Sequence, residues 1–520
     1  MLDYRQLDRY QRKAVLHGEG PLLVIAGPGS GKTFTLIHRI LFLLQKGISP
    51  SNILMITYTN EAAQTMRARF QSFCTHDVKD LFIGTFHSFF YHILIQHHLI
   101  PKNSILTSLE KLNIILSVLP LFLDDFSAES RRNEVAHSFL QAMEYYKNSL
   151  DMEGACLRFD QEYRDVFPAI FDTYEKMRYQ SGKVDFDDMQ YHCFVFLRDN
   201  PNERERLQHQ YPYILVDEFQ DINPVQYEIL KLLSGKFCNT FVVGDDDQAI
   251  YGFRGAAPDI MTSFLEDFNA KQIQLRYNYR SEKDIVVGSL RLIQENHNRI
   301  PKKLQAQKQT QEKGSVVCKQ FLHESQQNAY LVERIQEKLK QGHSCAVLFR
   351  TNRHLQKFIN FYKEINDLCS LLTVHGAKGL EFDTVFIPNC NEGVFPYGWE
   401  RKTEETEEER RIFYVAVTRA KKCLELLTLK GTSKSPRQIS NYLTAFIPQP
   451  TRRIHNCPGT HQKHLQQLHI RRHRRYSQAP VLRWGRRGFH YICKTIPRHL
   501  HFLLVHPKEE EQCNLYRERE

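Results

Sequence analysis

Residues 22–33, LLVIAGPGSGKT, begin as an apolar run and end in glycines followed by Lys-Thr. The pattern G-x-x-x-x-G-K-[ST] is typical of a phosphate-binding loop. The apolar run predicts a buried parallel strand, and a helix is predicted from about Lys32 because apolar residues then recur at helical spacing. Backbone N–H groups of such a loop surround a polyphosphate at the helix N-terminus. The stretch therefore predicts a nucleotide-binding α/β domain.

The loop residues have distinct expected roles. Lys32 supplies a positive charge for the outer phosphates. Thr33 offers a hydroxyl to Mg²⁺, which prefers oxygen ligands. We therefore expect ATP and Mg²⁺ as cofactors. The other positions expected to line the nucleotide are Gly27, Pro28, Gly29, Ser30, Gly31 and Phe34.

Composition indicates a folded chain with more than one domain. It has 520 residues, 42% of them hydrophobic, which is too long for a single ordinary core. The twelve cysteines occur singly, which fits a reducing compartment and argues against a zinc ribbon. The N-terminus has no apolar signal core and no stretch is long enough to span a bilayer, so we expect a cytoplasmic protein without a membrane partner.

A pair of carboxylates follows the apolar segment 214–216. Asp217 and Glu218 close this predicted strand. Nucleotide hydrolysis needs one group that supports the metal and one that orients or deprotonates the attacking water. A surface acidic pair is the alternative, but it would not usually end an apolar strand.

Other segments combine amide, aromatic and cationic residues. The segment after the predicted strand 241–243 contains Gln248, Tyr251, Phe253 and Arg254. Aromatic residues beside arginine can stack on bases and hold a phosphate backbone. His87, in the segment TFHS, would by itself more often be a packed core histidine.

Two arginines follow later in the chain, in the segments NYRS and VAVTRAKK. They are Arg280 and Arg419. An arginine that reaches the nucleotide from a second domain can neutralise charge on a transferring phosphoryl group. Gln11 lies about twenty residues before Lys32, which brings its amide within reach of a base.

The motifs AGPGSGKT, TYTNEAA, TFHS, VDEFQDIN, VGDDDQAIYGFRGA, NYRS, VHGAKGLEF and VAVTRAKK occur in this order. In their residues and in their order these motifs resemble those of the superfamily 1 DNA helicases of the UvrD/Rep/PcrA family, from about Leu7 to Leu443. The resemblance implies two RecA-like domains with parallel sheets. ATP would lie between them, and single-stranded DNA would cross both while the motor moves 3′ to 5′.

The resemblance also implies roles for individual residues. Gln11 would read adenine, Tyr279 would stack on it and Glu381 would bind the ribose. Thr33 and Asp217 would serve the metal, and the implied catalytic residues are Glu218, Gln248, Arg280 and Arg419. Base stacking is implied for Tyr58, Tyr251 and Phe253, and positions near the DNA backbone for Asn60, His87, Arg254 and His375.

The resemblance and the composition together give a domain plan. The first RecA-like domain is expected over residues 1–90 and 182–262, with a helical insertion over 91–181. The second is expected over 263–450. The family inserts a large subdomain between residues that correspond to 350 and 373 here, whereas this chain has room only for a helix and a short connector. A second departure is Phe34, where the family usually has arginine.

Residues 451–520 form a basic tail. They carry 15 Lys/Arg against five Glu, which accounts for +10 of the formal net charge of +11. We interpret the tail as flexible and solvated. The alternative is that its basic residues make nonspecific contacts with phosphates of a nucleic acid. A change of reading frame is a further explanation for the abrupt shift in composition.

The predicted function is an ATP-dependent 3′–5′ DNA helicase or translocase on single-stranded DNA, in repair or replication, with duplex–single-strand junctions as further substrates. The alternative is a DNA-stimulated ATPase that binds or remodels single strands without unwinding duplex. The absent insertion separates the two hypotheses, because in the family it contacts duplex DNA.

Overall fold

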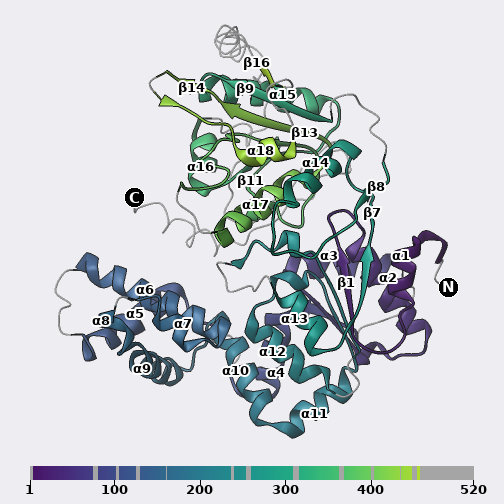
Figure 1. Ribbon diagram of the computed structural model, residues 1–520. Coiled ribbons are helices and arrows are strands. Elements are labelled where there is room, and N and C mark those ends of the chain that lie inside the picture. Colours follow the sequence, from purple (N-terminus) through teal and green to yellow (C-terminus); the bar gives the residue numbers. More distant parts are fainter. Residues whose placement is uncertain are drawn as a thin grey trace, which may run out of the picture. The chain divides into compact units, whose positions relative to one another are not determined.

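Two parallel sheets organise the part of the chain that the structure describes (Figure 1). The computed structural model describes residues 4–73, 80–100, 105–123, 129–159, 161–235, 239–252, 259–308, 315–361, 368–399, 403–433, 435–447 and 454–456. Both sheets lie in one compact unit, Met1–His461. Each sheet has six strands, and the strand pairs within each are parallel.

The first sheet has the strand order β3-β2-β4-β5-β1-β6. Two of its inner strands are buried along their whole length and the two between them are buried except at the first residue, as expected for a parallel sheet that is covered on both faces. The strands are β1 (Leu22–Ala26), β2 (Ile53–Thr57), β3 (Phe82–Thr85), β4 (Tyr213–Val216), β5 (Asn239–Gly244) and β6 (Lys271–Leu275).

Helices cover both faces of this sheet. Alternate residues of a strand point to opposite faces, so Leu23 and Ile25 pack in one core and Leu22 and Val24 in another. The first core includes α4 (Phe86–Gln96), α10 (Phe186–Asp199), α11 (Pro201–Gln210), α12 (Pro224–Ser234) and α13 (Ile260–Asp267). The second includes α1 (Arg9–Val15), α2 (Lys32–Gln45) and α3 (Asn60–Phe73).

A group of helices lies between α4 and α10 in the sequence, within the range 91–181 expected to be a helical insertion. They surround a core of their own, rich in phenylalanine. They are α5 (Ser108–Val118), α6 (Glu129–Ser149), α7 (Met152–Cys156), α8 (Gln161–Arg164) and α9 (Phe167–Gln180). Their separate core makes this group a structural element beside the sheet rather than a cover for it.

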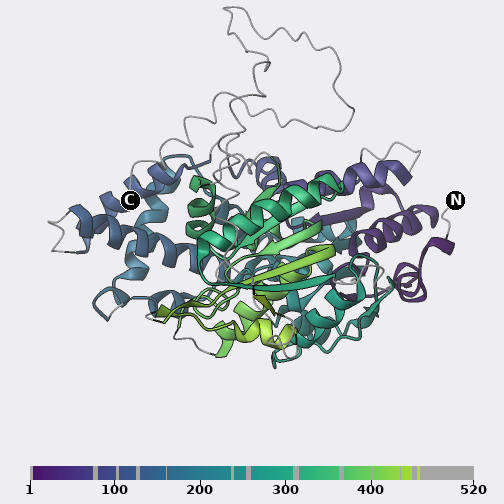
Figure 2. The same ribbon diagram turned by 90° about the horizontal axis from the view of Figure 1, so that it is seen from above.

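The second sheet has the strand order β11-β10-β12-β13-β9-β16. Figure 2 shows the strands of this half of the chain from above, in shades of green. Its strands are β9 (Val316–Phe321), β10 (Cys345–Phe349), β11 (Ser370–Thr373), β12 (Phe382–Ile387), β13 (Ala420–Leu429) and β16 (Ile454–Asn456). The strand β16 lies inside the range 451–520 that the sequence assigned to the tail, and it pairs with β9.

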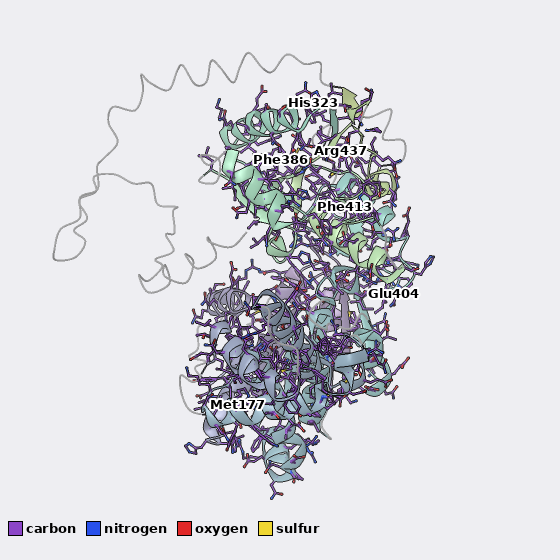
Figure 3. All side chains as sticks on the ribbon, turned by 90° about the vertical axis from the view of Figure 1, so that its left-hand side faces the viewer. Met177, His323, Phe386, Glu404, Phe413 and Arg437 are labelled. Atoms are coloured by element: carbon purple, nitrogen blue, oxygen red, sulfur yellow. The ribbon has the colours of Figure 1, made fainter. Side chains whose placement is uncertain are left out.

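Helices flank the second sheet as well. Phe413 packs in one core and Phe386 in the other (Figure 3). The first core includes α14 (Lys283–Ile293), α17 (Thr403–Val417) and α18 (Asn441–Phe446), and the second includes α15 (Glu324–Lys340) and α16 (Asn352–Phe361). Two short pairs complete the strands: β7 (Tyr277–Asn278) with β8 (Gln305–Ala306), and β14 (Gly431–Thr432) with β15 (Ser435–Pro436).

The connection from β10 to β11 concerns the expected absence of an inserted subdomain. After β10 ends at Phe349, α16 follows and β11 begins at Ser370, directly beside β10 in the sheet. Residues 362–367 of the expected connector lie outside the described residues.

The predicted α/β fold with parallel sheets is confirmed. The expected strand 22–26 is β1, and the helix expected from Lys32 is α2. Within the described ranges, no helix combines the length and the apolar character that a membrane crossing requires.

Candidate functional site

The glycine-rich loop turns sharply between β1 and α2. Gly29 and Gly31 adopt left-handed φ angles of 68° and 83°, which glycine reaches without steric cost. A Cβ at Gly29 would lie 2.5 Å from Cβ of Arg280, and one at Gly31 would lie 2.7 Å from Nε2 of Gln11. The loop therefore has no room for side chains at these positions, and its backbone curls tightly at the start of α2.

The two carboxylates follow β4 at the same edge of the sheet. Asp217 N donates to the carbonyl of Ile56, and Asp217 is buried. Glu218 has a left-handed backbone, with φ 50°. Its Oε2 lies 3.4 Å from Nζ of Lys32 and accepts a 2.7 Å hydrogen bond from Gln220. The fold thus brings the loop lysine and the acidic pair together.

The two carboxyl groups have opposite electrostatic surroundings. Burial, and next the charge of Glu218, raise the pKa of Asp217 well above its ordinary value. Burial also disfavours the charged form of Glu218, but the charges of Lys32 and Lys378 outweigh that cost and hold its pKa below the ordinary range. Glu218 is therefore ionised at neutral pH, whereas Asp217 is a buried acid whose ionisation a cation would favour.

The residues expected at the base lie around the N-terminal turn of α1. Gln11 Nε2 donates to the carbonyl of Ser30 at 3.0 Å, and Gln11 Oε1 accepts from Asp8 N at 3.2 Å. Tyr279 N donates to the Gly29 carbonyl at 2.9 Å, and its hydroxyl donates to Asp8 at 2.7 Å. The Gln11 amide therefore supports the loop and the cap of α1.

Phe34, at the position where the family usually has arginine, packs on aromatic neighbours. Its ring centroid lies 4.0 Å from that of His38 and 6.4 Å from that of Phe73. The residue therefore contributes apolar surface beside the loop, with no cation at this position.

The two arginines expected in the second domain lie at its boundary with the first. Arg419 is 2% exposed, and its Nη2 donates to Oε1 of Gln248 at 2.9 Å. Arg280 Nε donates to Glu381 at 2.7 Å. Burial, and next the charge of Arg280, lower the pKa of Arg419 to about 9. The expected catalytic residues Gln248 and Arg419 are thus in direct contact, while Arg280 is paired with the expected ribose ligand.

Three of the residues expected to contact DNA form an aromatic group. Tyr58 and Tyr251 stack with centroids 5.1 Å apart and an interplanar angle of 21°. The ring of His375 lies 6.3 Å from that of Tyr251. Burial, and next the charge of Arg350, lower the pKa of His375 to about 4, so its ring is neutral at pH 7.

The other expected DNA residues are less closely grouped. Asn60 begins α3. His87 is on α4, with its ring 6.1 Å from that of Phe186, and burial lowers its pKa. Phe253 and Arg254 lie outside the described residues.

A cavity of about 210 Å³ connects the acidic pair to the aromatic group. Its lining includes Thr33, Tyr58, Asp217, Glu218, Tyr251 and Lys378. Residues expected to serve the nucleotide and residues expected to serve DNA therefore share one cavity, with Lys378 of the second domain between them.

Sequence reasoning gave no role to Lys378, Asp221 or Phe186. Lys378 Nζ contacts both carboxylate oxygens of Asp221, at 2.6 and 2.5 Å. Phe186 is 56% exposed and begins α10 beside His87. The segments GAKGLEF and VDEFQDIN contain Lys378 and Asp221, but their contact joins positions 157 apart, which no local pattern predicts.

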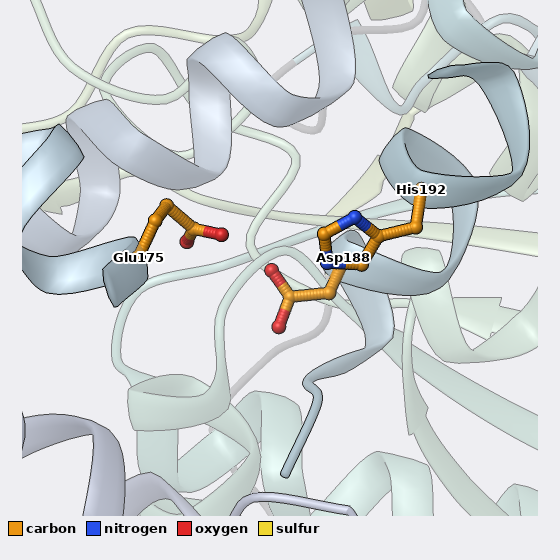
Figure 4. A group of neighbouring side chains, drawn as sticks. All are labelled: Glu175, Asp188 and His192. Carbon is orange, nitrogen blue, oxygen red and sulfur yellow. The ribbon is translucent and has the colours of Figure 1, made fainter. Parts of the chain in front are cut away.

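A second carboxylate cluster lies where α9 meets α10. Oxygen and nitrogen atoms of Glu175, Asp188 and His192 lie within 4.8 Å of one another (Figure 4). Lys147 contacts both acids, and Arg178 lies 2.8 Å from His192 Nε2. Two cations therefore already occupy the positions that a metal ion would take, and we assign the cluster a structural role.

Family comparison covers most of the chain. The UvrD/REP helicase N-terminal domain matches residues 7–269, and the UvrD-like helicase C-terminal domain matches 273–366 and 362–431. These two domains are the family that the motifs resembled, so that prediction is confirmed.

Relatives of the chain have names that agree with these domains. DNA helicase II of Haemophilus influenzae is 36% identical over 363 residues, which are 66% of this chain and 48% of that protein. ATP-dependent DNA helicase PcrA of Staphylococcus epidermidis is 34% identical over 398 residues, 71% and 54% respectively. The chain thus spans about half the length of these two relatives.

A third relative is closer in extent. A probable DNA helicase of Mycoplasma pneumoniae is 31% identical over 462 residues, which are 82% of this chain and 84% of that protein. On the matched domains, the chain belongs to the UvrD/REP helicase family.

Proposed function

We propose that the chain is an ATP-dependent motor that moves 3′ to 5′ on single-stranded DNA and unwinds duplex, in DNA repair or replication. The observation that supports this best is the contact of Arg419 in the second domain with Gln248 in the first, beside the loop lysine and Glu218. An arginine in that place can respond to charge on a nucleotide only while the two domains are close. Opening and closing of the domains would then accompany each hydrolysis cycle.

The donor set fits a nucleoside triphosphate with a divalent cation. Gly29 and Gly31 have no room for a Cβ, because the side chains of Arg280 and Gln11 pack against them, so only glycine lets the loop backbone curl at the start of α2. Asp217 and Thr33 line one cavity and offer a carboxylate and a hydroxyl, which are the ligands that Mg²⁺ prefers. When bound, the cation would supply positive charge that stabilises the outer phosphates.

In this proposal, residues of both domains act on the phosphates. Lys32 holds the outer phosphates, and Glu218, ionised at neutral pH, orients or deprotonates the attacking water. Gln248 senses the terminal phosphate through its amide. Arg280 and Arg419 stabilise negative charge as it develops, and Arg280 must first leave Glu381.

The base and ribose contacts complete the nucleotide site. Tyr279 stacks on adenine, and Glu381 binds the ribose after Arg280 has turned away. Gln11 reads adenine only if its amide exchanges the Ser30 or Asp8 bond for a bond to the base. Gln11 should therefore contribute less to base specificity than its sequence position implies.

On the DNA side, Tyr58 and Tyr251 supply stacking surfaces. The rings now stack on each other, so a base enters between them only when they separate. Phe253 is proposed as a third stacking residue. A stacked base contributes roughly 1 to 3 kcal/mol in such grooves.

Four further residues are proposed to lie near the DNA backbone: Asn60, His87, Arg254 and His375. We propose that the protein acts on DNA in the cytoplasm.

A DNA-stimulated ATPase that grips or remodels single strands without unwinding duplex is the second candidate. The short α16 connection between the adjacent strands β10 and β11 favours it. The similarly long relative from Mycoplasma pneumoniae, whose name is probable DNA helicase, favours unwinding. Duplex–single-strand junctions are proposed substrates only if the chain unwinds.

The deciding experiment measures ATP turnover of the purified full chain with and without oligo(dT), and then strand displacement on duplexes with a 3′ or a 5′ tail. We expect turnover to rise with oligo(dT) and only the 3′-tailed duplex to separate. Stimulated turnover without displacement would select the second candidate. Turnover that does not respond to DNA would contradict both.

A further inference from the structure

The chain returns to the first domain after it has entered the second. Helix α14 packs in a core of the second sheet, but residues 299–306, which follow it, lie against the first domain. Ile300 packs on a core of the first sheet, and a Cβ at Gly27 would lie only 3.2 Å from Cδ2 of Leu304. This returning segment, residues 299–306, therefore lies beside the phosphate-binding loop.

A lysine of the returning segment lies among three consecutive aspartates. The side chain of Lys302 is 4% exposed, and its Nζ lies 2.9 Å from Asp245, 2.6 Å from Asp246 and 2.6 Å from Asp247. Arg299 makes two hydrogen bonds to Asp247, which therefore has a second cation. Within the described ranges, Lys302 is the one cation that pairs with Asp245 and Asp246.

The lysine is charged although it is buried. Burial disfavours the ammonium form, but the charges of the three aspartates outweigh this cost and raise the pKa of Lys302 above its ordinary value. An ion pair that is shielded from water is screened little by salt. The ammonium group therefore holds the Asp245 carboxylate strongly.

Asp245 connects this lysine to the proposed phosphate sensor. Its Oδ2 accepts a 2.6 Å hydrogen bond from Nε2 of Gln248, while its Oδ1 faces Nζ of Lys302. Oε1 of Gln248 accepts from Arg419 at 2.9 Å. An ionised carboxylate only accepts hydrogen bonds and a guanidinium only donates them, so the Gln248 amide has a single orientation between the two.

We propose that Lys302 is a positioning residue for ATP hydrolysis, which fixes the orientation of the Gln248 amide by holding the Asp245 carboxylate. The proposal rests on the proposed function, because there Gln248 contacts the terminal phosphate. An amide that turned over would direct its Nε2 at Arg419, so that two donors would face each other. Loss of Lys302 should therefore slow hydrolysis more than it weakens ATP binding, which depends mainly on the loop and Lys32.

Variants of the cluster separate positioning from folding. Lys302→Met alone leaves buried carboxylates without their cation, and unpaired buried charges destabilise a fold. A double variant, Lys302→Met with Asp246→Asn, removes one charge of each sign and leaves Arg299 on Asp247. Asp246→Asn alone is its reference. Lys302→Arg keeps the charge, and Lys303→Met is the matched control, because Lys303 is exposed and lies in the same segment.

The readouts are the single-turnover rate of ATP hydrolysis with saturating oligo(dT), the affinity for a nonhydrolysable ATP analogue, and thermal unfolding, all with the full chain. We expect the rate of the double variant to fall about tenfold below that of Asp246→Asn, as for the loss of one hydrogen bond to a charged group. Affinity for the analogue should change much less. Lys302→Arg should retain part of the rate, and Lys303→Met all of it.

Asp245→Asn tests the same contact from the other side. The side chain keeps its size and loses the charge that faces Lys302, and its amide can donate as well as accept, so the Gln248 amide no longer has a single orientation. We expect a fall in rate similar to that of the double variant. A normal rate in Asp245→Asn would overturn the proposal even if the double variant does not fold.

A double-mutant cycle with Gln248→Ala shows whether Lys302 acts through Gln248. In the Gln248→Ala background, the further change of Lys302 and Asp246 should slow hydrolysis little beyond the effect of Asp246→Asn, because the side chain that Lys302 positions is already absent. Effects that multiply would overturn the proposal, since they would show that Lys302 acts by another route.

The outcomes separate this proposal from the proposed function. A double variant that hydrolyses ATP as fast as Asp246→Asn, or that loses only melting temperature, overturns the positioning role and leaves the proposed function intact. Wild-type protein that does not hydrolyse ATP, or Gln248→Ala that hydrolyses it at the wild-type rate, overturns the proposed roles at the ATP site and the positioning role with them.

Discussion

Two acidic segments of this chain look alike in sequence and differ in their surroundings. VDEFQD places Asp217 and Glu218 at the end of β4, where they line a cavity and face Lys32. VDFDD places Asp185 and Asp188 at the start of α10, where Lys147 contacts both and cations fill the space around them. Carboxylates that are saturated by protein partners hold a fold together, while carboxylates that face a cavity remain available to a ligand.

The largest effect should come from the first segment. Glu218→Gln should lower turnover by roughly 10² to 10⁴-fold, because it removes the proposed base. Nucleotide affinity should change little in this variant and fall clearly in Lys32→Ala, which removes the phosphate charge. Turnover and equilibrium binding of a fluorescent ATP analogue measure both effects.

Glu228→Gln is the control for this prediction. Glu228 is on α12 and pairs with Lys231 at the surface, so its removal should leave turnover unchanged. Normal hydrolysis by Glu218→Gln would show that the base has been assigned wrongly.

In the second segment, the effect should fall on stability instead. Lys147→Met leaves Asp188 and Glu175 buried without this cation, at an expected cost of roughly 3 to 5 kcal/mol in the free energy of unfolding. Thermal unfolding measures it. Lys183→Met, which removes the half-exposed partner of Glu110, should cost less than about 1 kcal/mol.

Turnover by the Lys147→Met protein below its melting temperature should stay near that of wild type. If the variant keeps full stability but loses turnover, the second segment belongs to the chemistry and the contrast between the two segments fails.

Variants of Arg280 and Arg419 test whether hydrolysis at the first segment depends on the second domain. Arg280→Ala and Arg419→Ala should each slow hydrolysis by roughly 10² to 10³-fold while ATP binding weakens much less, because their charge acts mainly in the transition state. Single-turnover rates and binding constants, measured separately, would show the difference. Full activity in either variant would mean that its arginine does not reach the phosphates.

The smallest expected effect is a pH dependence of folding stability that arises near the second segment. Burial, and next the Arg178 charge, lower the pKa of His192 to about 4. Between pH 6.5 and 4 the unfolded chain therefore binds a proton that the folded chain does not, so stability falls as the pH decreases. The total is at most about 3.4 kcal/mol, at 1.36 kcal/mol per pH unit over about 2.5 units.

His192→Gln should remove this slope, so its stability relative to wild type should improve on going from pH 7 to pH 5. Urea unfolding at both pH values measures the difference, with the exposed His209→Gln as control. A wild-type slope that persists in His192→Gln would place the titration elsewhere.

The sequence predicted features that depend on local pattern. Residues 22–33 predict a strand, a loop and a helix, and the structure has β1 and α2 there. This prediction succeeds because the spacing of apolar residues and the position of glycine determine structure within a few residues. The contacts of the Gln11 side chain were not predicted in this way. Asp8 and Gln11 form a capping box, a pattern visible in the sequence, and this box now occupies the amide that was expected at the base.

Long-range contacts were beyond the sequence. The Lys378–Asp221 pair joins positions 157 apart, and the Lys147–Asp188 pair positions 41 apart. Composition shows that acids and lysines exist, but only the packed fold decides which acids are neutralised. The sequence singled out VDEFQD because it closes an apolar strand, but the cations that neutralise VDFDD became apparent only in the structure.

The left-handed backbone of Glu218 has a consequence for engineering. A residue other than glycine in this conformation costs of order 1 kcal/mol, and Asn or Gly visits it more readily. Replacement by either would relax the turn after β4 and remove the proposed base in one step. On the proposed assignment of the base, selection of this chain for heat resistance alone would favour sequences that lack it, a trade-off between stability and activity at this residue.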